Sequence, residues 1–114
     1  MLGNIAYAQT TDTTVPSVPT NLLASLSTTP GQISISWTAS TDNVGVAGYY
    51  IYRNGTLIAN TSGTLFTDIT SPGGYTYSIT AYDAAGNISS QSGSTTPIFI
   101  IAEPHLLPPQ LGFI

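Results

Sequence analysis

The sequence predicts an all-β domain built from two packed sheets, and three observations lead to this prediction. Short segments of alternating apolar and polar residues recur along the chain, while no segment repeats its apolar residues at helical spacing. Gly, Pro and Asn separate these segments at intervals of roughly 8–12 residues, the spacing expected of strands in a sandwich. Asn54-Gly55 lies between two such segments. This pair is a strong hairpin signal, because both turn positions need a positive φ.

Seven short strands are expected from this pattern. In the second strand Ile33, Ile35 and Trp37 share one face, so Trp37 is predicted to pack in the core. In the sixth strand Tyr77, Ile79 and Ala81 alternate in the same way, with Tyr75 in phase before them. The predicted strands are, in chain order, residues 22–27, 32–38, 48–53, 56–59, 65–69, 75–83 and 88–96.

The composition divides the chain into a domain and two tails. Residues 1–14 are interpreted as a signal-peptide remnant followed by a Thr-rich linker, because Ala6-Tyr7-Ala8 has the small-x-small pattern of a cleavage site. The alternative is a merely apolar N-terminus. Residues 15–96 form the predicted domain, and residues 97–114 form a Pro-rich apolar tail that is expected to be disordered. A truncated next domain, a scrambled end and a partner-docking tail would each fit that segment.

Charge and cysteine content exclude several classes of function. Arg53 is the single basic residue among 114 residues with a formal net charge of −4, so the chain cannot neutralise a run of phosphates or bind an anionic membrane surface. There is no cysteine, and therefore neither a disulfide nor a Cys-based metal site. No stretch reaches the length of roughly 20 apolar residues that a transmembrane helix needs.

Five stretches of the sequence carry a family resemblance: Val18-Pro19-Thr20-Asn21-Leu22, residues 33–37, residues 40–49, Ile51-Tyr52-Arg53-Asn54-Gly55 and residues 75–87. Through these stretches, residues 15 to about 96 resemble a fibronectin type III domain, of the kind appended to bacterial secreted glycoside hydrolases and surface proteins. The resemblance implies a seven-stranded immunoglobulin-like sandwich with flexible N- and C-terminal tails. It also implies that Trp37 is the core tryptophan and that Tyr75 is a corner tyrosine whose hydroxyl bonds upstream backbone.

Catalytic chemistry finds no support in the sequence, and the chain is predicted not to be an enzyme. His105 is the only histidine, and it lies in the tail far from any partner that could make it a base. Asp42 and Asp83, with Asn43 and Asn87, could offer oxygens to calcium. Asp and Asn are also the residues that cap turns, so this second role is favoured and no metal or other cofactor is predicted.

Tyr50, Tyr52 and Tyr82 are the candidate binding residues. They are out of phase with the inward residues of their strands and are expected to share one solvent face, with Thr76, Ser78 and Thr80 between them. Such a face suits stacking on sugar rings or packing on a neighbouring domain. The competing interpretation is cross-strand pairing that stabilises the sheet by ~0.2–1 kcal/mol per pair.

The function predicted from these observations is a non-catalytic spacer or interaction module of an exported, bacterial protein linked to polysaccharide degradation or surface adhesion. The alternative is a carbohydrate-binding module that uses the three tyrosines. Neighbouring domains or proteins are the expected partners, with polysaccharide as the partner in the alternative. The protein is expected to be monomeric and secreted or attached to the cell surface, with no nucleic acid partner and no membrane insertion.

Overall fold

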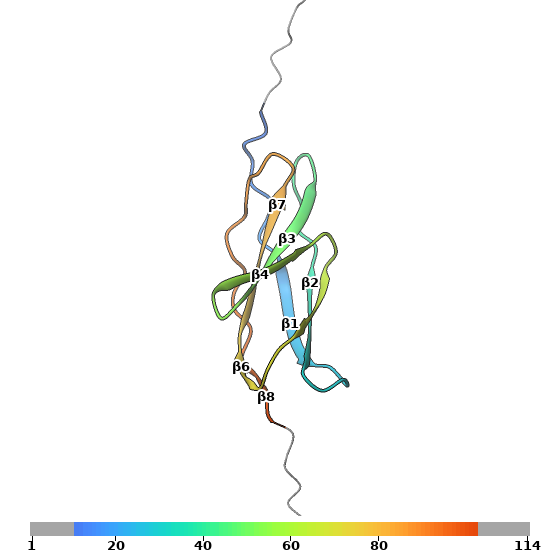
Figure 1. The fold of residues 1–114 in the computed structure, drawn as a ribbon. Helices are drawn as coiled ribbons and strands as arrows, with labels where there is room; N and C mark the ends of the chain where they lie inside the picture. The colour runs from blue at the N-terminus through green and yellow to red at the C-terminus, as the bar shows by residue number, and fades with distance from the viewer. Residues whose placement is uncertain (1–10, 103–114) are drawn as a thin grey trace, which may run out of the picture.

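The computed structural model describes residues 11–102, which form an elongated domain of antiparallel strands (Figure 1). Among these residues no helix is long and apolar enough to cross a membrane. The strands are β1 (Thr20–Leu26), β2 (Gln32–Thr38), β3 (Val46–Arg53), β4 (Thr56–Thr61), β5 (Leu65–Ile69), β6 (Gly73–Tyr75), β7 (Tyr77–Asp83) and β8 (Ile98–Ile100).

Two three-stranded sheets face each other. One has the order β1-β2-β5, the other has the order β4-β3-β7, and the short strands β6 and β8 pair separately at one end of the domain. The alternating residues of β2, β3 and β7 fill the space between the sheets, which is why their inward side chains are apolar. The core residues are Ile33, Ile35, Trp37, Tyr49, Ile51, Tyr77, Ile79, Ala81 and Ile100. The predicted all-β sandwich is confirmed.

The β3–β4 hairpin forms where the sequence predicts it. Asn54 and Gly55 have φ values of 52° and 82°, the left-handed conformation that Asn and Gly accept at lower cost than other residues. The Asn54 side chain also accepts hydrogen bonds from the backbone N–H and the hydroxyl of Thr76. This contact fixes the turn against the start of β7.

Trp37 and Tyr75 occupy the positions that the resemblance implies. Trp37 is buried, and its ring meets Tyr49 edge-on at a centroid distance of 5.3 Å. The Tyr75 hydroxyl donates a 2.7 Å hydrogen bond to the carbonyl oxygen of Ser71, four residues upstream. The corner tyrosine is therefore present, and it ends the short strand β6 rather than following a Pro-Gly-Gly turn.

The prediction of a regular last strand over residues 88–96 is wrong. Residues 89–97 lie alongside β7 without strand geometry, and only Ile88 forms an isolated bridge, with Tyr82. Three hydroxyl residues, each three positions after the previous one, make the contacts instead. Each accepts a hydrogen bond from a β7 N–H and donates its own N–H to the same β7 residue: Ser89 with Ala81, Ser92 with Ile79, and Thr95 with Tyr77. We call this arrangement the hydroxyl clasp.

The predicted C-terminal boundary is also corrected. Residues 98–100 form β8, which pairs with β6, and Ile100 is buried in the core with 8% of its surface exposed. The prediction of a disordered tail from residue 97 is therefore wrong for these residues, because an apolar strand follows directly after Pro97. The predicted signal-peptide remnant and the part of the tail from residue 103 onward, with His105, lie outside the described residues.

The described chain enters and leaves the domain at opposite ends, as Figure 1 shows by the blue and orange-red ends of the colour scale. At the entry, Ser17 and Thr41 exchange backbone and side-chain hydrogen bonds, and Pro16 and Pro19 are buried. The side chain of Asn87 donates a hydrogen bond to the carbonyl of Asp12. The entering segment is thus attached to the domain from residue 12 onward, earlier than the predicted boundary at residue 15.

Candidate functional site

The three candidate tyrosines lie on the outer face of the β4-β3-β7 sheet. Tyr50 and Tyr52 come from β3 and Tyr82 comes from β7, and each is partly exposed. The rings of Tyr50 and Tyr82 stack with a centroid distance of 4.4 Å and an interplanar angle of 30°. The Tyr52 hydroxyl lies 3.4 Å from the hydroxyl of Thr80. We call these three residues the tyrosine face.

Gly48 determines where the ring of Tyr82 lies. The two residues are paired across β3 and β7. A Cβ on Gly48 would lie 2.5 Å from the Tyr82 hydroxyl oxygen and 2.7 Å from Cζ, well inside van der Waals contact. The absence of a side chain at this position therefore lets the Tyr82 ring lean across β3 and reach Tyr50. Sequence periodicity places the three tyrosines on one face, but it does not reveal this packing.

The hydroxyl residues predicted between the tyrosines are not on a solvent face. Ser78 and Thr80 are 4% and 3% exposed. Each of them contacts another side chain: the Tyr52 hydroxyl lies 3.4 Å from that of Thr80, and Gln91 accepts a 3.0 Å hydrogen bond from Ser78. Thr76 is half-buried and bonded to Asn54. The tyrosine face is therefore an aromatic surface over buried hydroxyls rather than a platform with free hydroxyls between the rings.

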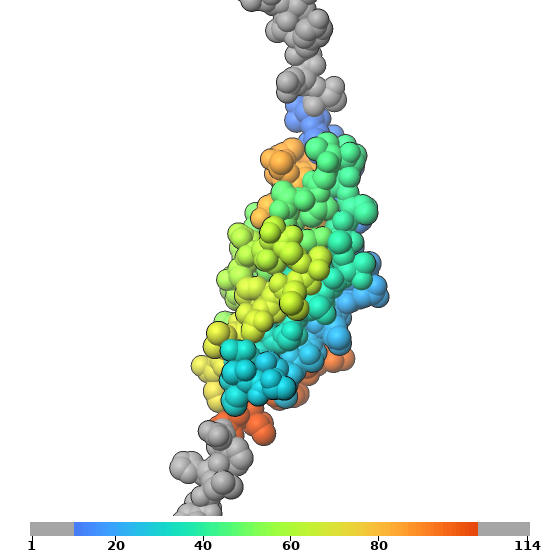
Figure 2. Space-filling model, turned by 90° about the vertical axis from the view of Figure 1, so that its right-hand side faces the viewer, coloured from blue at the N-terminus to red at the C-terminus, as the bar shows by residue number. Residues whose placement is uncertain are grey.

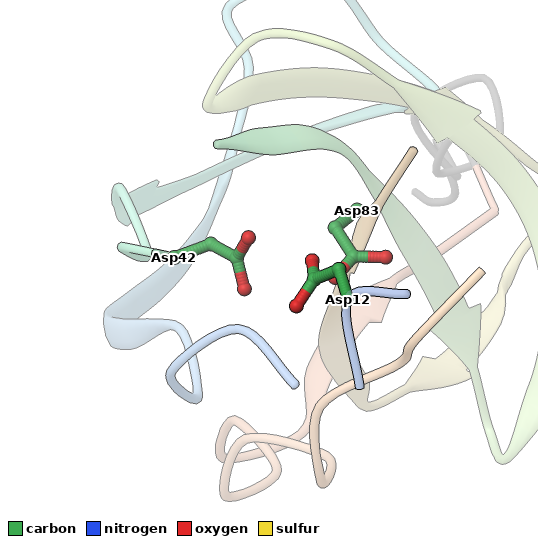
Figure 3. Close-up of side chains that lie close together, drawn as sticks. All are labelled: Asp12, Asp42 and Asp83. Atoms are coloured by element: carbon green, nitrogen blue, oxygen red, sulfur yellow. The ribbon is translucent and has the colours of Figure 1, made fainter. Parts of the chain in front are cut away.

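A second cluster gathers three carboxylates at the end of the domain where the chain enters. One oxygen each from Asp12, Asp42 and Asp83 lies within 4.8 Å of the others, and Figure 3 shows the three side chains in one close group. Asp42 and Asp83 are the residues that the sequence offers as possible calcium ligands. The sequence pattern places Asp12 in the linker, because no local pattern reveals a contact with a residue so distant in the chain.

Backbone and amide donors already bind these carboxylates. Asp42 accepts hydrogen bonds from the N–H groups of Val44 and Gly45, and Asp83 accepts from the backbone and side chain of Asn87. Burial raises the pKa of Asp83, but its hydrogen bonds, first among them those from Asn87, lower the pKa by more, so that it lies below the ordinary value. The predicted turn-capping role of Asp42 is thus what its contacts show.

An ion pair crosses between the two sheets near the opposite end. Arg53 from β3 places Nη1 2.9 Å from both carboxylate oxygens of Asp68 in β5. The buried hydroxyl of Tyr77 donates a 2.6 Å hydrogen bond to the same carboxylate. The single cation of the chain is therefore held within the fold.

Comparison with known proteins places this chain among segments of polysaccharide-degrading enzymes. No family model matches it. It is 53% identical over 94 residues to chitinase Chi52 of Paenibacillus xylanexedens, covering 81% of this chain. It is 46% identical over 89 residues to exoglucanase B of Cellulomonas fimi, covering 76% of this chain. The chain spans only 18% of the length of that chitinase and 8% of that exoglucanase.

Two solved structures also match the fold of this chain. The fold superposes on chitinase ChiA74 from Bacillus thuringiensis with a TM-score of 0.67 and 31% identity, covering 82% of this chain and 14% of that one. It superposes on the structure named FN3tt mut with a TM-score of 0.59 and 25% identity, covering 73% of this chain and 97% of that one. The second match is to a structure hardly larger than the matching region.

Proposed function

We propose that this chain, which is a fibronectin type III module, is a non-catalytic spacer in a secreted protein that degrades polysaccharide. The relatives support this role, because the matching region is a small fraction of a chitinase and of an exoglucanase. The whole protein to which the module contributes is then a bacterial enzyme that acts on an insoluble glycan outside the cell.

The observation that carries the proposal is the position of the two chain ends. The first and the last described segments, at the blue and the orange-red ends of the colour scale, lie at opposite ends of an elongated domain (Figure 1). Whatever precedes and follows the module is therefore separated by the length of a folded body. A rigid body holds a defined separation, whereas a flexible linker of Gly and Ser samples a broad range of distances.

The residues of the domain also support a non-catalytic role. A glycosidase needs two carboxyl groups that flank a sugar in a cleft, one of them free to donate a proton. In the described part of the chain, the clustered carboxylates accept hydrogen bonds from turn amides, and Asp68 is bound by Arg53 and Tyr77. The hydrogen bonds of these carboxylates stabilise the turns and hold the two sheets together.

The spacer role is tested by measuring the distance that the module maintains. Two spin-labelled carrier proteins are joined through the whole chain and, as a control, through a Gly/Ser linker of equal length. We expect a narrow distance distribution for this chain and a broad one for the linker. Equally broad distributions would remove the proposal. The purified chain is also expected to release no sugar from chitin or cellulose, and a reproducible rate would contradict the non-catalytic assignment.

Glycan binding by the tyrosine face is a second candidate function. The observation that favours it is that three partly exposed aromatic rings share one sheet face. It is tested by retention on insoluble chitin, cellulose and xylan, comparing the chain with a variant that carries Tyr50→Ala, Tyr52→Ala and Tyr82→Ala. A matched control carries Leu23→Ala, Val44→Ala and Leu65→Ala, which are exposed positions elsewhere. Retention that both variants share would exclude the tyrosine face.

A further inference from the structure

We propose that Asp12, Asp42 and Asp83 form a calcium site where the described chain enters the domain. This site goes beyond the spacer role and does not depend on it. The proposal rests on the convergence of three carboxylates, on a buried oxygen of Asp42 that no hydrogen bond satisfies, and on the balance of charge around the cluster.

Three segments that are far apart in the sequence bring the carboxylates together. Asp12 lies in the entering segment, Asp42 in the loop between β2 and β3, and Asp83 at the end of β7. One oxygen of each lies within 4.8 Å of the others (Figure 3). Figure 2 shows this meeting from outside, with blue entering residues beside green and orange ones at the upper end of the molecule. The cluster is therefore built by the fold and not by one turn.

Neutral donors hold two of the carboxylates in place. Asn43 Nδ2 donates a 3.2 Å hydrogen bond to Asp12 Oδ1. Asn87 Nδ2 donates 2.9 Å hydrogen bonds to the backbone carbonyl oxygen of Asp12 and to Asp83 Oδ2. Each carboxylate oxygen has two lone pairs, so an oxygen that accepts one hydrogen bond can still bind a cation. These donors orient the cluster and leave its charge in place.

Asp42 has one oxygen that its turn-capping role does not use. Its Oδ2 accepts the hydrogen bonds from the N–H groups of Val44 and Gly45. Its Oδ1 is buried from solvent, and no donor among residues 11–102 reaches it. Figure 3 shows the carboxylate of Asp42 directed towards the other two. Burying a charged oxygen without a partner is costly, so this oxygen indicates a ligand that hydrogen bonding within the described chain does not supply.

The described residues do not balance the negative charge of the cluster. Three carboxylates this close repel one another. Arg53 is the only Lys or Arg residue of the chain, and it is bound to Asp68. A divalent cation between the carboxylates would remove the repulsion and give Asp42 Oδ1 a partner at the same time.

The ligand atoms and their spacing favour calcium over other cations. Carboxylate oxygens are hard ligands that suit Ca²⁺ and Mg²⁺. Calcium lies about 2.3–2.6 Å from its ligands, so opposite ligands are about 5 Å apart, whereas magnesium at about 2.0–2.1 Å holds them within about 4.2 Å. Oxygens that lie within 4.8 Å of one another therefore fit around calcium with little movement. Water and carbonyl oxygens would complete its shell of about six to eight ligands.

Calcium at this position would join the entering segment to the two sheets. Asp12 precedes β1, Asp42 follows β2 of one sheet, and Asp83 ends β7 of the other. The ion would thus fix the direction in which the chain enters the domain. It would also stabilise the folded state, because the unfolded chain does not bring the three carboxylates together.

The test titrates the full chain, freed of metal by chelation, with CaCl₂ at constant ionic strength. Amide NMR should show saturable shifts confined to residues 12–14, 42–45 and 83–87, with a Kd of about 10⁻³ M or lower. The urea midpoint should rise with calcium, and MgCl₂ should bind at least tenfold more weakly. Shifts that do not saturate, that arise elsewhere, or that MgCl₂ reproduces at the same concentrations would overturn the proposal.

Two variants and a control test the assigned ligands. Asp12→Asn and Asp42→Asn keep the size of the side chain and remove one charge, and each should weaken calcium binding at least tenfold. Val15→Ser changes a side chain of the entering segment that is 52% exposed, and it should bind calcium as the unchanged chain does. Spectra without calcium report whether each variant is folded. Asp12 lies outside the strands, so Asp12→Asn is decisive if Asp42→Asn does not fold. A folded Asp12→Asn that binds calcium with unchanged affinity would overturn the proposal.

Discussion

The Tyr77 hydroxyl and the Asp68 carboxylate, 2.6 Å apart, connect the two sheets of the domain. Tyr77 belongs to β7 and Asp68 to β5, and both are buried, with 1% and 5% of their surfaces exposed. Arg53 adds the charge that balances Asp68. Its guanidinium also lies 5.5 Å from the centre of the Tyr75 ring. A buried carboxylate is acceptable in this core because its hydrogen-bond partners are in place.

Removing the Tyr77 hydroxyl should therefore destabilise the domain. Tyr77→Phe deletes a hydrogen bond to a charged acceptor, which contributes about 1.5–3 kcal/mol. Urea unfolding followed by Trp37 fluorescence measures the change in the free energy of unfolding. Tyr52→Phe is the matched control, because that hydroxyl makes only a 3.4 Å contact with Thr80 on the outer face. Equal losses in the two variants would contradict the role of the Asp68 bond.

Alkaline pH should weaken the fold through the same residue. Burial, followed by the hydrogen bond to Asp68, raises the pKa of Tyr77 far above its ordinary value. Below about pH 10 both the folded and the unfolded chain keep this proton, so the stabilisation is complete. At higher pH the unfolded chain releases the proton and the folded chain retains it, so stability falls as pH rises.

The measurement is the urea midpoint between pH 8 and pH 11. The decrease in the urea midpoint over this range should be smaller in Tyr77→Phe, because that variant lacks the Tyr77 hydroxyl proton. If the urea midpoint decreases by the same amount in both proteins, Tyr77 does not control the loss of stability at alkaline pH.

The hydroxyl clasp should be sensitive to loss of one oxygen. Ser92→Ala leaves the buried N–H of Ile79 without its acceptor, which typically costs about 1–3 kcal/mol. We expect faster hydrogen exchange at the Ile79 amide together with a lower urea midpoint. Ser94→Ala is the control, because Ser94 is outside the clasp and lies between the clasp residues Ser92 and Thr95. An unchanged Ile79 amide in Ser92→Ala would argue that the clasp contributes nothing.

Gly48 and Tyr82 should be energetically coupled. Gly48→Ala places a methyl group against the Tyr82 ring, and such overpacking typically costs about 1–3 kcal/mol. Part of this loss should disappear in a Tyr82→Ala background, where the ring is gone. The remaining loss reflects the Thr61 carbonyl oxygen, which would lie 3.0 Å from the added methyl group. A double-mutant cycle by urea unfolding measures the coupling, and strict additivity would contradict it.

The pKa of Asp83 should depend on Asn87. In Asn87→Ala the side-chain hydrogen bond to Asp83 is lost, so the pKa should rise towards its ordinary value. A carboxyl-selective NMR titration from pH 7 to pH 2 measures this change. At pH values above the ordinary pKa of an aspartate, the lowered pKa of Asp83 stabilises the folded state, and this stabilisation is lost as the pH falls through the pKa of the folded state. Asn87→Ala should therefore make the free energy of unfolding depend less on pH in the acid range. Unchanged titration would assign the depression to other groups.

Most of the fold could be predicted from local patterns in the sequence. Asn54-Gly55 requires a hairpin, and the alternation of Ile33, Ile35 and Trp37 determines which side of β2 is buried. The clasp could not be predicted in this way, because side-chain hydroxyls at a spacing of three replace the backbone contacts of a strand. Its Ser and Thr residues are compatible with an ordinary polar edge.

The candidate sites were less predictable because they depend on contacts between distant segments. Periodicity indicates the direction of Tyr50, Tyr52 and Tyr82. It does not reveal the hydrogen bond between Ser78 and Gln91, which joins β7 to a later segment of the chain. The approach of Asp12 to Asp83 joins a predicted linker to the end of β7. Pro97 makes the following residues look like a tail in the sequence, yet β6 provides a partner for their strand.

The hydroxyl clasp has a consequence for the behaviour of the protein at high concentration. Exposed sheet edges can pair with other molecules, and many β-proteins prevent this by placing charged side chains along the edge. This chain has few charges to place in that way. Residues 89–95 bind the β7 edge while lacking the repeat of a strand, so they offer no regular row of donors and acceptors to an incoming chain. Self-association is thereby restrained at this edge by geometry rather than by repulsion.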